Sequence, residues 1–301
     1  MTNQNRIVLV TGASGNVGGE IIKQLASSVS SNVQIAIRAA AHSQNGVDKL
    51  AQYAKTVEIV TMDYNMPETV AAALHNVSTL FLLTLPSLQM ADTALKVISE
   101  AKKHGVEYIV KQSVFGADAE PGILVGRLHR QEEKIIEESG IAHTFIRPSA
   151  FMQNLVNYFG YTIKTQNAIF LPAGQGKVSF VDARDVAAVA AKLLIRANGT
   201  RYDNRAIVGT GSEALSYGQC AEVISKQTGR KIAYIDITEE DARKGMKAMG
   251  TEDWLVEAIL EEFHQTKLGN RSKTSNTVEE ILGRKPNSFG SFVKDYVNSF
   301  N

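Results

Sequence analysis

The sequence predicts an α/β protein: a Rossmann-type, doubly wound parallel sheet with a small mixed α+β C-terminal lobe. Two observations predict this fold. Short apolar runs alternate with amphipathic helical patterns from Arg6 to about Pro148, and a glycine-rich turn directly follows the first apolar run. After Pro148 the alternation becomes looser. We therefore expect one domain over residues 1–150 and a smaller lobe over residues 151–301 that is interleaved with the Rossmann sheet.

Six segments have the composition of strands that are covered by helices on both faces. They are dense in Val, Ile, Leu, Phe and Tyr and alternate little between apolar and polar positions. These strand candidates are Ile7–Thr11, Val33–Ile37, Val57–Met62, Thr79–Leu83, Tyr108–Gln112 and His143–Ile146. Between them, apolar residues recur at helical spacing in Gly18–Ser27, Pro67–Leu74, Ala91–His104 and Leu128–Ser139.

The smaller lobe contains fewer and shorter patterns. Val178–Val181 and Ile232–Ile237 have strand composition, whereas Asp185–Leu194 and Trp254–Glu262 have helical spacing. This mixture of elements predicts an α+β lobe without a repeating strand–helix unit.

Composition excludes several classes of protein. The chain has 301 residues, of which 44% are hydrophobic, and its 32 basic and 31 acidic residues leave a net charge of +1. We therefore expect neither a nucleic-acid surface nor a membrane segment. The single cysteine, Cys220, excludes an intrachain disulfide, and the histidines show no spacing typical of metal ligands. No signal-peptide pattern stands at the start, so we expect a cytoplasmic protein.

The strongest motif is the glycine loop Thr11–Gly18, which follows the first strand and opens a helix. Glycines at these positions permit a tight turn, a close approach of the backbone to a pyrophosphate, and close packing of helix on strand. We expect residues 1–150 to form an NAD(P)-binding domain. The candidate cofactor-binding residues of the loop are Gly12, Ala13, Ser14, Gly15, Asn16, Val17 and Gly18.

Other cofactor contacts are expected where the later strands end. Arg38 stands at the end of the second predicted strand, and no acidic residue follows before Asp48. A guanidinium pairs with a 2′-phosphate, so we expect NADP(H) as cofactor, unless Arg38 is an ordinary surface arginine. Asp63 could lie near the adenine or cap the next helix. The segment Thr84, Leu85 and Pro86 should pass close to the nicotinamide ribose.

Five segments together resemble a known family. Thr11–Gly18 has the GxxGxxG spacing of short-chain dehydrogenases/reductases, and Gln112-Ser113 follows the fifth strand. Ser139–Pro148, Phe151–Asn154 and Val181–Ala187 complete a pattern that resembles the NmrA-like group of atypical short-chain dehydrogenases/reductases. The resemblance spans nearly the whole chain. It implies a Rossmann domain, NADP binding, and either reduction of quinones, azo compounds or enones or a regulatory role without turnover.

One feature of the superfamily is missing. The acid/base pair Tyr-x-x-x-Lys occurs nowhere, and no tyrosine lies between Tyr108 and Tyr158. Two other groups are candidate catalytic residues: His129 as a proton donor and Ser113 as a hydrogen-bond donor to a substrate carbonyl. The structural alternatives are a solvent-exposed histidine and a serine that satisfies its own loop. We also expect Lys111 to be a solvated edge residue and Glu132-Glu133-Lys134 to form a solvated face.

The expected substrate is a small-molecule electron acceptor, with Phe151 and Asn154 as substrate contacts from the smaller lobe. We expect an NADPH-dependent reductase that transfers a hydride to a conjugated acceptor such as a quinone. A quinone accepts charge on oxygen, so it does not require a tyrosine–lysine pair. The alternative is a non-catalytic NADP(H)-binding sensor that acts through a regulatory protein partner. A homodimer is also compatible with the sequence.

Overall fold

The computed structural model describes residues 6–29, 35–195 and 202–301, which form two compact units. The first unit comprises the chain up to Asp118, Gly126–Arg147 and Val186–Ile207. The second unit comprises Ala119–Val125, Pro148–Asp185 and Val208–Asn301. The first unit therefore takes in chain from both sides of residue 150.

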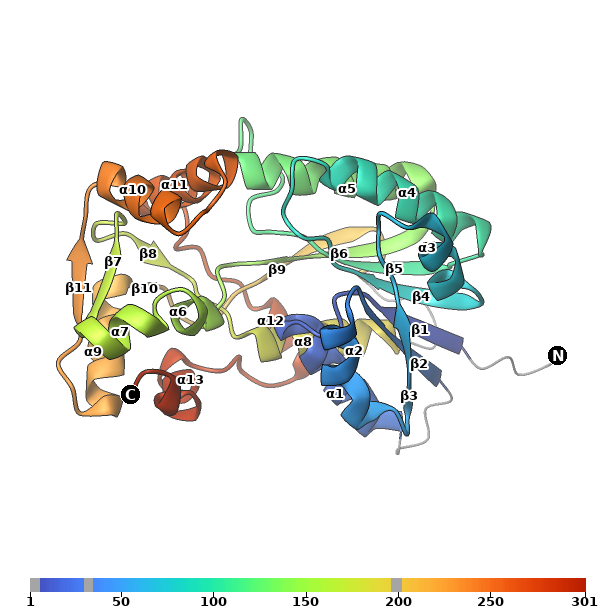
Figure 1. Ribbon diagram of the computed structural model, residues 1–301, viewed down its shortest axis with the longest axis horizontal. Helices are drawn as coiled ribbons and strands as arrows, with labels where there is room; N and C mark the ends of the chain where they lie inside the picture. The colour runs from blue at the N-terminus through green and yellow to red at the C-terminus, as the bar shows by residue number, and fades with distance from the viewer. Residues whose placement is uncertain (1–5, 30–34, 196–201) are drawn as a thin grey trace. The chain divides into compact units, whose positions relative to one another are not determined.

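The first unit is built on a seven-stranded sheet with the order β3-β2-β1-β4-β5-β6-β9 (Figure 1). Its strands are β1 (Arg6–Val10), β2 (Ile35–Ala41), β3 (Val57–Thr61), β4 (Val77–Leu82), β5 (Tyr108–Gln112), β6 (Ala142–Pro148) and β9 (Arg205–Gly209). The pairs β1–β2, β1–β4, β2–β3, β4–β5 and β5–β6 are all parallel. The doubly wound sheet expected from the sequence is confirmed. Of the predicted strand Val33–Ile37, the first two residues lie outside the described residues.

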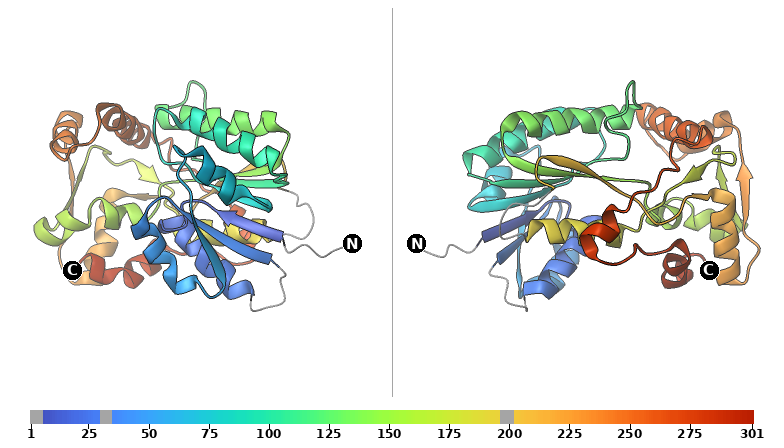
Figure 2. Two further views of the ribbon diagram at one scale, coloured as in Figure 1. Left: turned by 45° about the vertical axis from the view of Figure 1, so that its right-hand side comes forward. Right: turned by 180° about the vertical axis from the view of Figure 1, so that it is seen from behind.

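Helices cover both faces of this sheet, as parallel strands require. They are α1 (Asn16–Val29), α2 (Gln44–Leu50), α3 (Pro67–Leu74), α4 (Met90–Lys103), α5 (Leu124–Ser139) and α8 (Ala183–Leu194). Figures 1 and 2 show α3, α4 and α5 against one face and α1 and α8 against the other. Between the sheet and α3–α5 lies a buried apolar core that includes Leu9, Leu80, Ile109 and Ile136.

The order of the strands decides where a ligand can bind. The chain runs outward from β1 to β3 on one side and continues from β4 on the other, so the winding direction reverses between β1 and β4. Open α/β sheets bind ligands at the carboxyl ends of the strands beside such a reversal. The carboxyl ends of β1, β2, β4 and β5 are therefore the region to search.

The second unit has two small sheets and its own core. Strands β7 (Ala168–Leu171) and β11 (Ala233–Asp236) pair in parallel, and β8 (Lys177–Val178) pairs antiparallel with β10 (Leu215–Ser216). Its helices are α6 (Gln153–Asn157), α7 (Gly160–Gln166), α9 (Tyr217–Thr228), α10 (Glu239–Ala248), α11 (Asp253–Lys267), α12 (Thr277–Leu282) and α13 (Phe289–Asp295). Aromatic side chains, among them Phe180, Phe289 and Phe292, are buried in this core.

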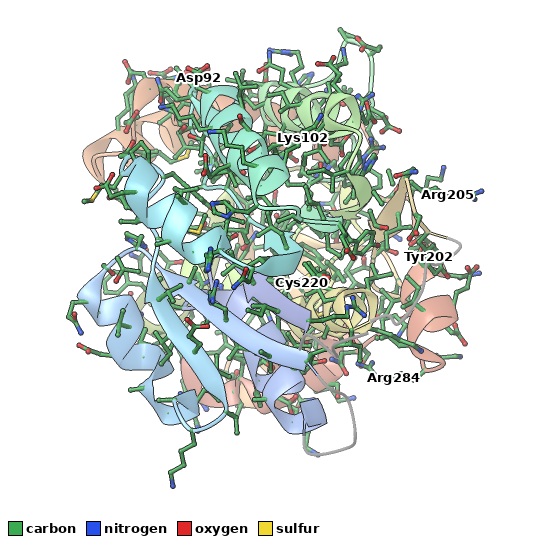
Figure 3. All side chains as sticks on the ribbon, turned by 90° about the vertical axis from the view of Figure 1, so that its right-hand side faces the viewer. Asp92, Lys102, Tyr202, Arg205, Cys220 and Arg284 are labelled. Atoms are coloured by element: carbon green, nitrogen blue, oxygen red, sulfur yellow. The ribbon has the colours of Figure 1, made fainter. Side chains whose placement is uncertain are left out.

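Two side-chain hydrogen bonds join segments of the first unit that are far apart in the chain. Lys102 on α4 donates to the carbonyl oxygen of Ser139 at the end of α5, at 3.0 Å. Thr144 Oγ1 on β6 donates to the carbonyl oxygen of Tyr202, at 2.8 Å. Lys102 and Tyr202 are labelled in Figure 3. Across the described residues, every helix is too short or too polar to cross a membrane.

Candidate functional site

The glycine loop joins β1 directly to α1 and is built mainly by the backbone. Gly12 has φ of 62°, the left-handed region in which a side chain would be strained. The N–H of Gly15 donates to the carbonyl oxygen of Gly12 at 3.0 Å, and the N–H of Ala13 donates to that of Ala40 on β2 at 3.2 Å. The loop is therefore a preformed turn that is fixed to the neighbouring strand.

The seven loop residues have two different environments. Gly12, Ser14, Gly15 and Asn16 are at least partly exposed, whereas Ala13, Val17 and Gly18 are buried. A Cβ on Gly18 would lie 2.1 Å from the carbonyl oxygen of Gly12, which no side chain tolerates. Gly18 thus lets α1 pack against the loop, and the exposed residues are the ones that can face a phosphate.

The threonine that opens the loop connects it to the end of β4, a role that the motif alone did not indicate. Thr11 Oγ1 donates to the carbonyl oxygen of Phe81 at 3.0 Å and accepts from the N–H of Leu83 at 2.8 Å. Tyr64 Oη donates to the carbonyl oxygen of Leu83 at 2.8 Å. The carboxyl ends of β1, β3 and β4 are therefore hydrogen-bonded to one another.

Arg38 does not lie where the sequence placed it. β2 continues to Ala41, so Arg38 is in the middle of the strand, and the expectation that it ends the strand is wrong. It is 7% exposed. Its Nε donates to Glu58 Oε2 and its Nη1 donates to the carbonyl oxygens of Ala73 and His75, all at 2.8 Å. A guanidinium held in this way ties β2 to β3 and α3, and its position does not suit a phosphate clamp.

The carboxyl end of β2 is instead followed by His42 and Ser43. His42 is exposed, and Ser43 Oγ caps α2 by accepting from the N–H of Gly46. This turn lies beside the glycine loop, because a Cβ on Gly46 would come within 3.1 Å of Ser14 Oγ. No carboxylate stands in the turn itself, and Asp48 accepts from Gln44 on α2. Sequence reasoning missed His42 because it ended the strand at Ile37, four residues before β2 ends at Ala41.

The remaining predicted cofactor contacts differ in exposure. Asp63 Oδ1 accepts from the N–H of Asn65 at 2.9 Å, so the carboxylate shapes the turn before α3. The structure does not give it a capping role at α3, whose N-cap is Met66. Thr84 is buried, whereas Leu85 is 71% exposed and Pro86 is also exposed. These residues follow β4 at the edge of the sheet where a ligand is expected.

A buried polar cluster lies between the end of β5 and α5. Lys111 is fully buried, and its Nζ donates to Thr84 Oγ1 at 3.1 Å and to the carbonyl oxygen of Gln112 at 2.7 Å. The same Nζ lies 2.8 Å from Glu132 Oε2 in an ion pair. The expectation that Lys111 is a solvated edge residue is therefore wrong. So is the expectation of a solvated face at Glu132 and Glu133, which are both fully buried.

His129 completes this cluster. Its Nδ1 lies 3.4 Å from Glu132 Oε2, and the residue is 8% exposed, which excludes a solvent-exposed histidine. Burial, and then the positive charge of Lys111, hold the pKa of His129 below its usual value, while Glu132 opposes them. Burial favours protonation of Glu132, but Lys111 and His129 outweigh it and lower the pKa of that carboxyl. At neutral pH the cluster thus contains an ion pair and a neutral imidazole.

A second ion-pair group involves the next residue of α5. Arg147 at the end of β6 donates from Nε to Glu133 Oε1 at 2.9 Å and from Nη2 to Oε2 at 2.7 Å. Arg130 also donates to Glu133, and Asp118 pairs with Arg147 at 2.6 Å. Burial favours protonation of Glu133, but Arg147, Ser113 and Arg130 together outweigh it and lower the pKa of this carboxyl. This carboxylate is saturated with donors, which is typical of a structural pair.

Several buried polar atoms beside the first cluster have no hydrogen-bond partner within the described residues. They are Gln112 Oε1, Ser113 Oγ and Glu132 Oε1, whereas Glu132 Oε2 lies in the ion pair with Lys111 and beside His129 Nδ1. The backbone N–H of Ser113 donates to the carbonyl oxygen of Ile146 at 2.7 Å, which fixes the residue, and its hydroxyl lies close enough to Glu133 to help lower the pKa of that carboxyl. Buried polar groups are normally paired, so these atoms mark a place where a ligand or water can bind.

The predicted substrate residues Phe151 and Asn154 belong to the second unit. Both are partly buried: Phe151 bridges to Val181, and Asn154 lies in α6. A narrow hollow within the same unit is lined by other residues, among them Met152, Phe180 and Phe289. The structure does not bring Phe151 or Asn154 to that hollow.

Two known proteins are similar to this chain in sequence over nearly its whole length. An NAD(P)H azoreductase from Xenophilus azovorans is 31% identical over 294 residues, 98% of this chain and 99% of that protein. A (4-alkanoyl-5-oxo-2,5-dihydrofuran-3-yl)methyl phosphate reductase from Streptomyces griseus is 29% identical over 297 residues, 98% of this chain and 99% of that protein.

A solved structure agrees with these sequence matches. The NADPH-dependent quinone oxidoreductase QOR2 from Escherichia coli, complexed with NADPH, superimposes with a TM-score of 0.82. It is 25% identical, and the match covers 98% of this chain and 100% of that chain. The sequence profile of the NmrA-like family matches residues 4–289, in agreement with the resemblance seen in the glycine loop and the later motifs. The chain belongs to the NmrA-like family.

Proposed function

We propose that this protein is an NADPH-dependent reductase that transfers a hydride to a conjugated, electron-poor acceptor such as a quinone. The observation that carries the proposal is the group of unpartnered polar atoms at the end of β5, which lies at the same sheet edge as a preformed glycine loop. The relatives support the proposal, since all three are named as reductases or oxidoreductases.

The residues at this edge fit a dinucleotide phosphate. The backbone of Gly12–Asn16 would hold the pyrophosphate, because the exposed side of the loop and the start of α1 offer N–H groups and a positive helix end. The turn after β2 suits a 2′-phosphate better than a free 2′-hydroxyl, since His42 and Ser43 replace the carboxylate that binds ribose hydroxyls. Bound there, NADPH supplies the hydride.

The relatives and the side chains at this edge support the proposed class of acceptor. Azo compounds, quinones and the unsaturated oxo-dihydrofuran ring of the named phosphate ester are all conjugated acceptors. Such molecules develop negative charge on an oxygen or nitrogen that a weak acid can protonate. Ser113 Oγ can donate a hydrogen bond to that atom, and His129 can supply the proton. This division of roles replaces the tyrosine–lysine pair that the chain lacks.

The proposal is tested by NADPH oxidation with purified protein against a panel of quinones, azo dyes and enones, with NADH in parallel. We expect acceptor-dependent turnover that favours NADPH. Binding of NADPH without turnover on any acceptor would contradict a reductase and leave a non-catalytic sensor as the remaining candidate. An equal rate with NADH would contradict the assignment of the β2–α2 turn to a 2′-phosphate.

A further inference from the structure

The buried cluster contains an ammonium group that the proposed function does not use. Lys111 reaches the end of β4 through Thr84 and reaches α5 through Glu132. Both Lys111 and Glu132 are 0% exposed. Removing two charges from water is costly, so a pair with no solvent contact is poor evidence of a gain in stability. Its placement next to His129 suggests a different role.

The geometry of His129 restricts how it can act. Nδ1 is buried and lies 3.4 Å from Glu132 Oε2, so a proton on Nδ1 would face the carboxylate. The side chain keeps 10% exposure, and Nε2 is the ring nitrogen left to face a bound molecule. A carboxylate that fixes one tautomer of a histidine in this way also orients its ring.

Charged and titratable groups from several elements surround the imidazole. Lys111 on β5 and Glu132 on the same helix are the nearest, and Glu133 acts at longer range. Glu133 is itself neutralised by Arg147 and Arg130. Across the cluster, Tyr64 is close enough to Glu132 for the carboxylate to oppose ionisation of its phenol. Arg147 and Arg130 thus pair with Glu133, whereas Lys111 pairs with Glu132. Lys111 is therefore the positive group that acts on His129.

We propose that Lys111 and Glu132 are a positioning pair that fixes the ring of His129 and sets the pH at which His129 can donate a proton to the reduced acceptor. This inference rests on the proposed reductase function. In the donation step the Nε2–H bond of the imidazolium breaks and an O–H or N–H bond forms on the acceptor, which has gained a hydride. The imidazole left behind takes its next proton from water. No other reactant is needed.

The two members of the pair have opposite effects. The ammonium of Lys111 repels a proton on His129, whereas the carboxylate of Glu132 attracts it. With both present, His129 stays neutral at neutral pH and becomes an acid only when the pH falls. Removing the ammonium should let the Glu132–His129 pair take up its proton at higher pH, wherever within the pair the proton resides.

The test is a Lys111→Met variant, studied by NMR of protein with labelled histidine and by the pH dependence of kcat. In wild type we expect the Nδ1–H tautomer of His129 and protonation below the usual pH of about 6.5. In the variant, protonation should move to higher pH, and the acid limb of kcat should move with it. The His129 signal is assigned by its loss in His129→Gln.

Two further variants serve as a control and as a replacement in case Lys111→Met does not fold. Lys134→Met removes a positive charge from the exposed side of α5 and should leave the His129 titration unchanged. If Lys111→Met fails to fold because Glu132 is left unpaired, the double variant Lys111→Met/Glu132→Gln removes both charges. We then expect both tautomers of His129 to be populated.

An unchanged His129 titration in Lys111→Met, or an unchanged tautomer in the double variant, would overturn the inference. The NMR experiment needs no turnover, so it tests the positioning pair even if the reductase assay fails. Conversely, turnover with an unshifted titration would support the reductase and contradict the role of Lys111.

Discussion

The glycine loop and the Lys111–Glu132–His129 cluster lie at one edge of the same sheet, but the loop is formed mainly by backbone groups and the cluster by side chains. The loop uses backbone N–H groups, tight turns and the absence of side chains, as at Gly12 and Gly18. The cluster uses three buried side chains whose charges control one another. The loop can therefore bind a fixed anion at any pH, whereas the behaviour of the cluster must change with pH.

Because of this difference, we expect the loop to determine cofactor binding and the cluster to determine the rate of the reaction. A backbone site tolerates changes of side chain but not an added Cβ where the chain passes close to itself. A cluster of buried charges is sensitive to the loss of one charge from a pair, because the charge left behind is buried without a partner. Variants of the loop should therefore change the affinity for NADPH, and variants of the cluster should change the rate and its pH dependence.

The largest effect is expected from Gly18→Ala. A Cβ there would lie 2.1 Å from the carbonyl oxygen of Gly12, so the loop or α1 must shift. Alanine in place of glycine within a helix normally stabilises by about 1 kcal/mol, but we expect the sign to reverse here. Affinity for NADPH, measured by fluorescence titration, should fall by on the order of a hundredfold.

The neighbouring glycine is the matched control. A Cβ on Gly19 would meet the carbonyl oxygen of Ala13 at an ordinary 3.5 Å. Gly19→Ala should therefore keep its NADPH affinity and unfold at an equal or higher urea concentration. Equal losses of affinity in both variants would show that the loop is not limited by the close approach at Gly18.

The next effect concerns the choice of coenzyme at the end of β2. His42→Glu places a carboxylate where we expect the 2′-phosphate, so the ratio of kcat/KM for NADPH to that for NADH should fall roughly tenfold or more. Arg38→Met should destabilise the protein, because Glu58 and two carbonyl oxygens lose their donor, and should leave that ratio unchanged. If the ratio of kcat/KM for NADPH to that for NADH changes in Arg38→Met and not in His42→Glu, the 2′-phosphate does not bind at the β2–α2 turn.

A smaller effect compares two buried hydroxyls. Ser113 Oγ lies near Glu133, whose carboxylate also accepts from Arg147 and Arg130, so Ser113→Ala should cost little stability and lower kcat/KM about tenfold. Thr144 Oγ1 bonds to Tyr108 Oη and to the carbonyl oxygen of Tyr202. Thr144→Val should therefore destabilise by about 1–3 kcal/mol and spare kcat/KM. Stability is measured by urea denaturation and kcat/KM by steady-state kinetics. A large loss of stability in Ser113→Ala, or a large loss of kcat/KM in Thr144→Val, would contradict these roles.

The smallest effect is a change of stability with pH. The pKa of His129 is lowered in the folded state, so the unfolded chain binds a proton first as the pH falls below about 6.5. Stability should fall through that range, by at most about 1.4 kcal/mol per pH unit. Urea denaturation of His129→Gln should lack this part of the slope. His104→Gln changes a partly exposed histidine outside the cluster and should keep this part of the slope. An identical slope in all three proteins would contradict the shift in the pKa of His129.

Much of the fold, but less of the site, could be predicted from the sequence. Strand β5 and helix α3 have the expected bounds, because apolar runs and helical spacing are local signals. The glycine loop was identified for the same reason. Arg38 was misplaced because Ala39–Ala41 do not look like a strand, although β1 and β3 hold them in the sheet.

The cluster was harder to predict because its members are far apart in the chain. Lys111 and Glu132 are polar residues that, taken singly, belong on a surface. They are buried because parallel pairing brings the ends of β4 and β5 together under α5, where each charge finds the other. A complementary charge on another element is a long-range property, and no spacing in the sequence signals it.

The most direct test of the account is kcat for quinone reduction by NADPH between about pH 5 and pH 8, measured for wild type and His129→Gln. We predict a wild-type kcat that rises as the pH falls towards the lowered pKa of His129, and a slower variant without that rise. If the two proteins have the same kcat and the same pH profile, His129 is not the proton donor and the buried cluster serves structure alone.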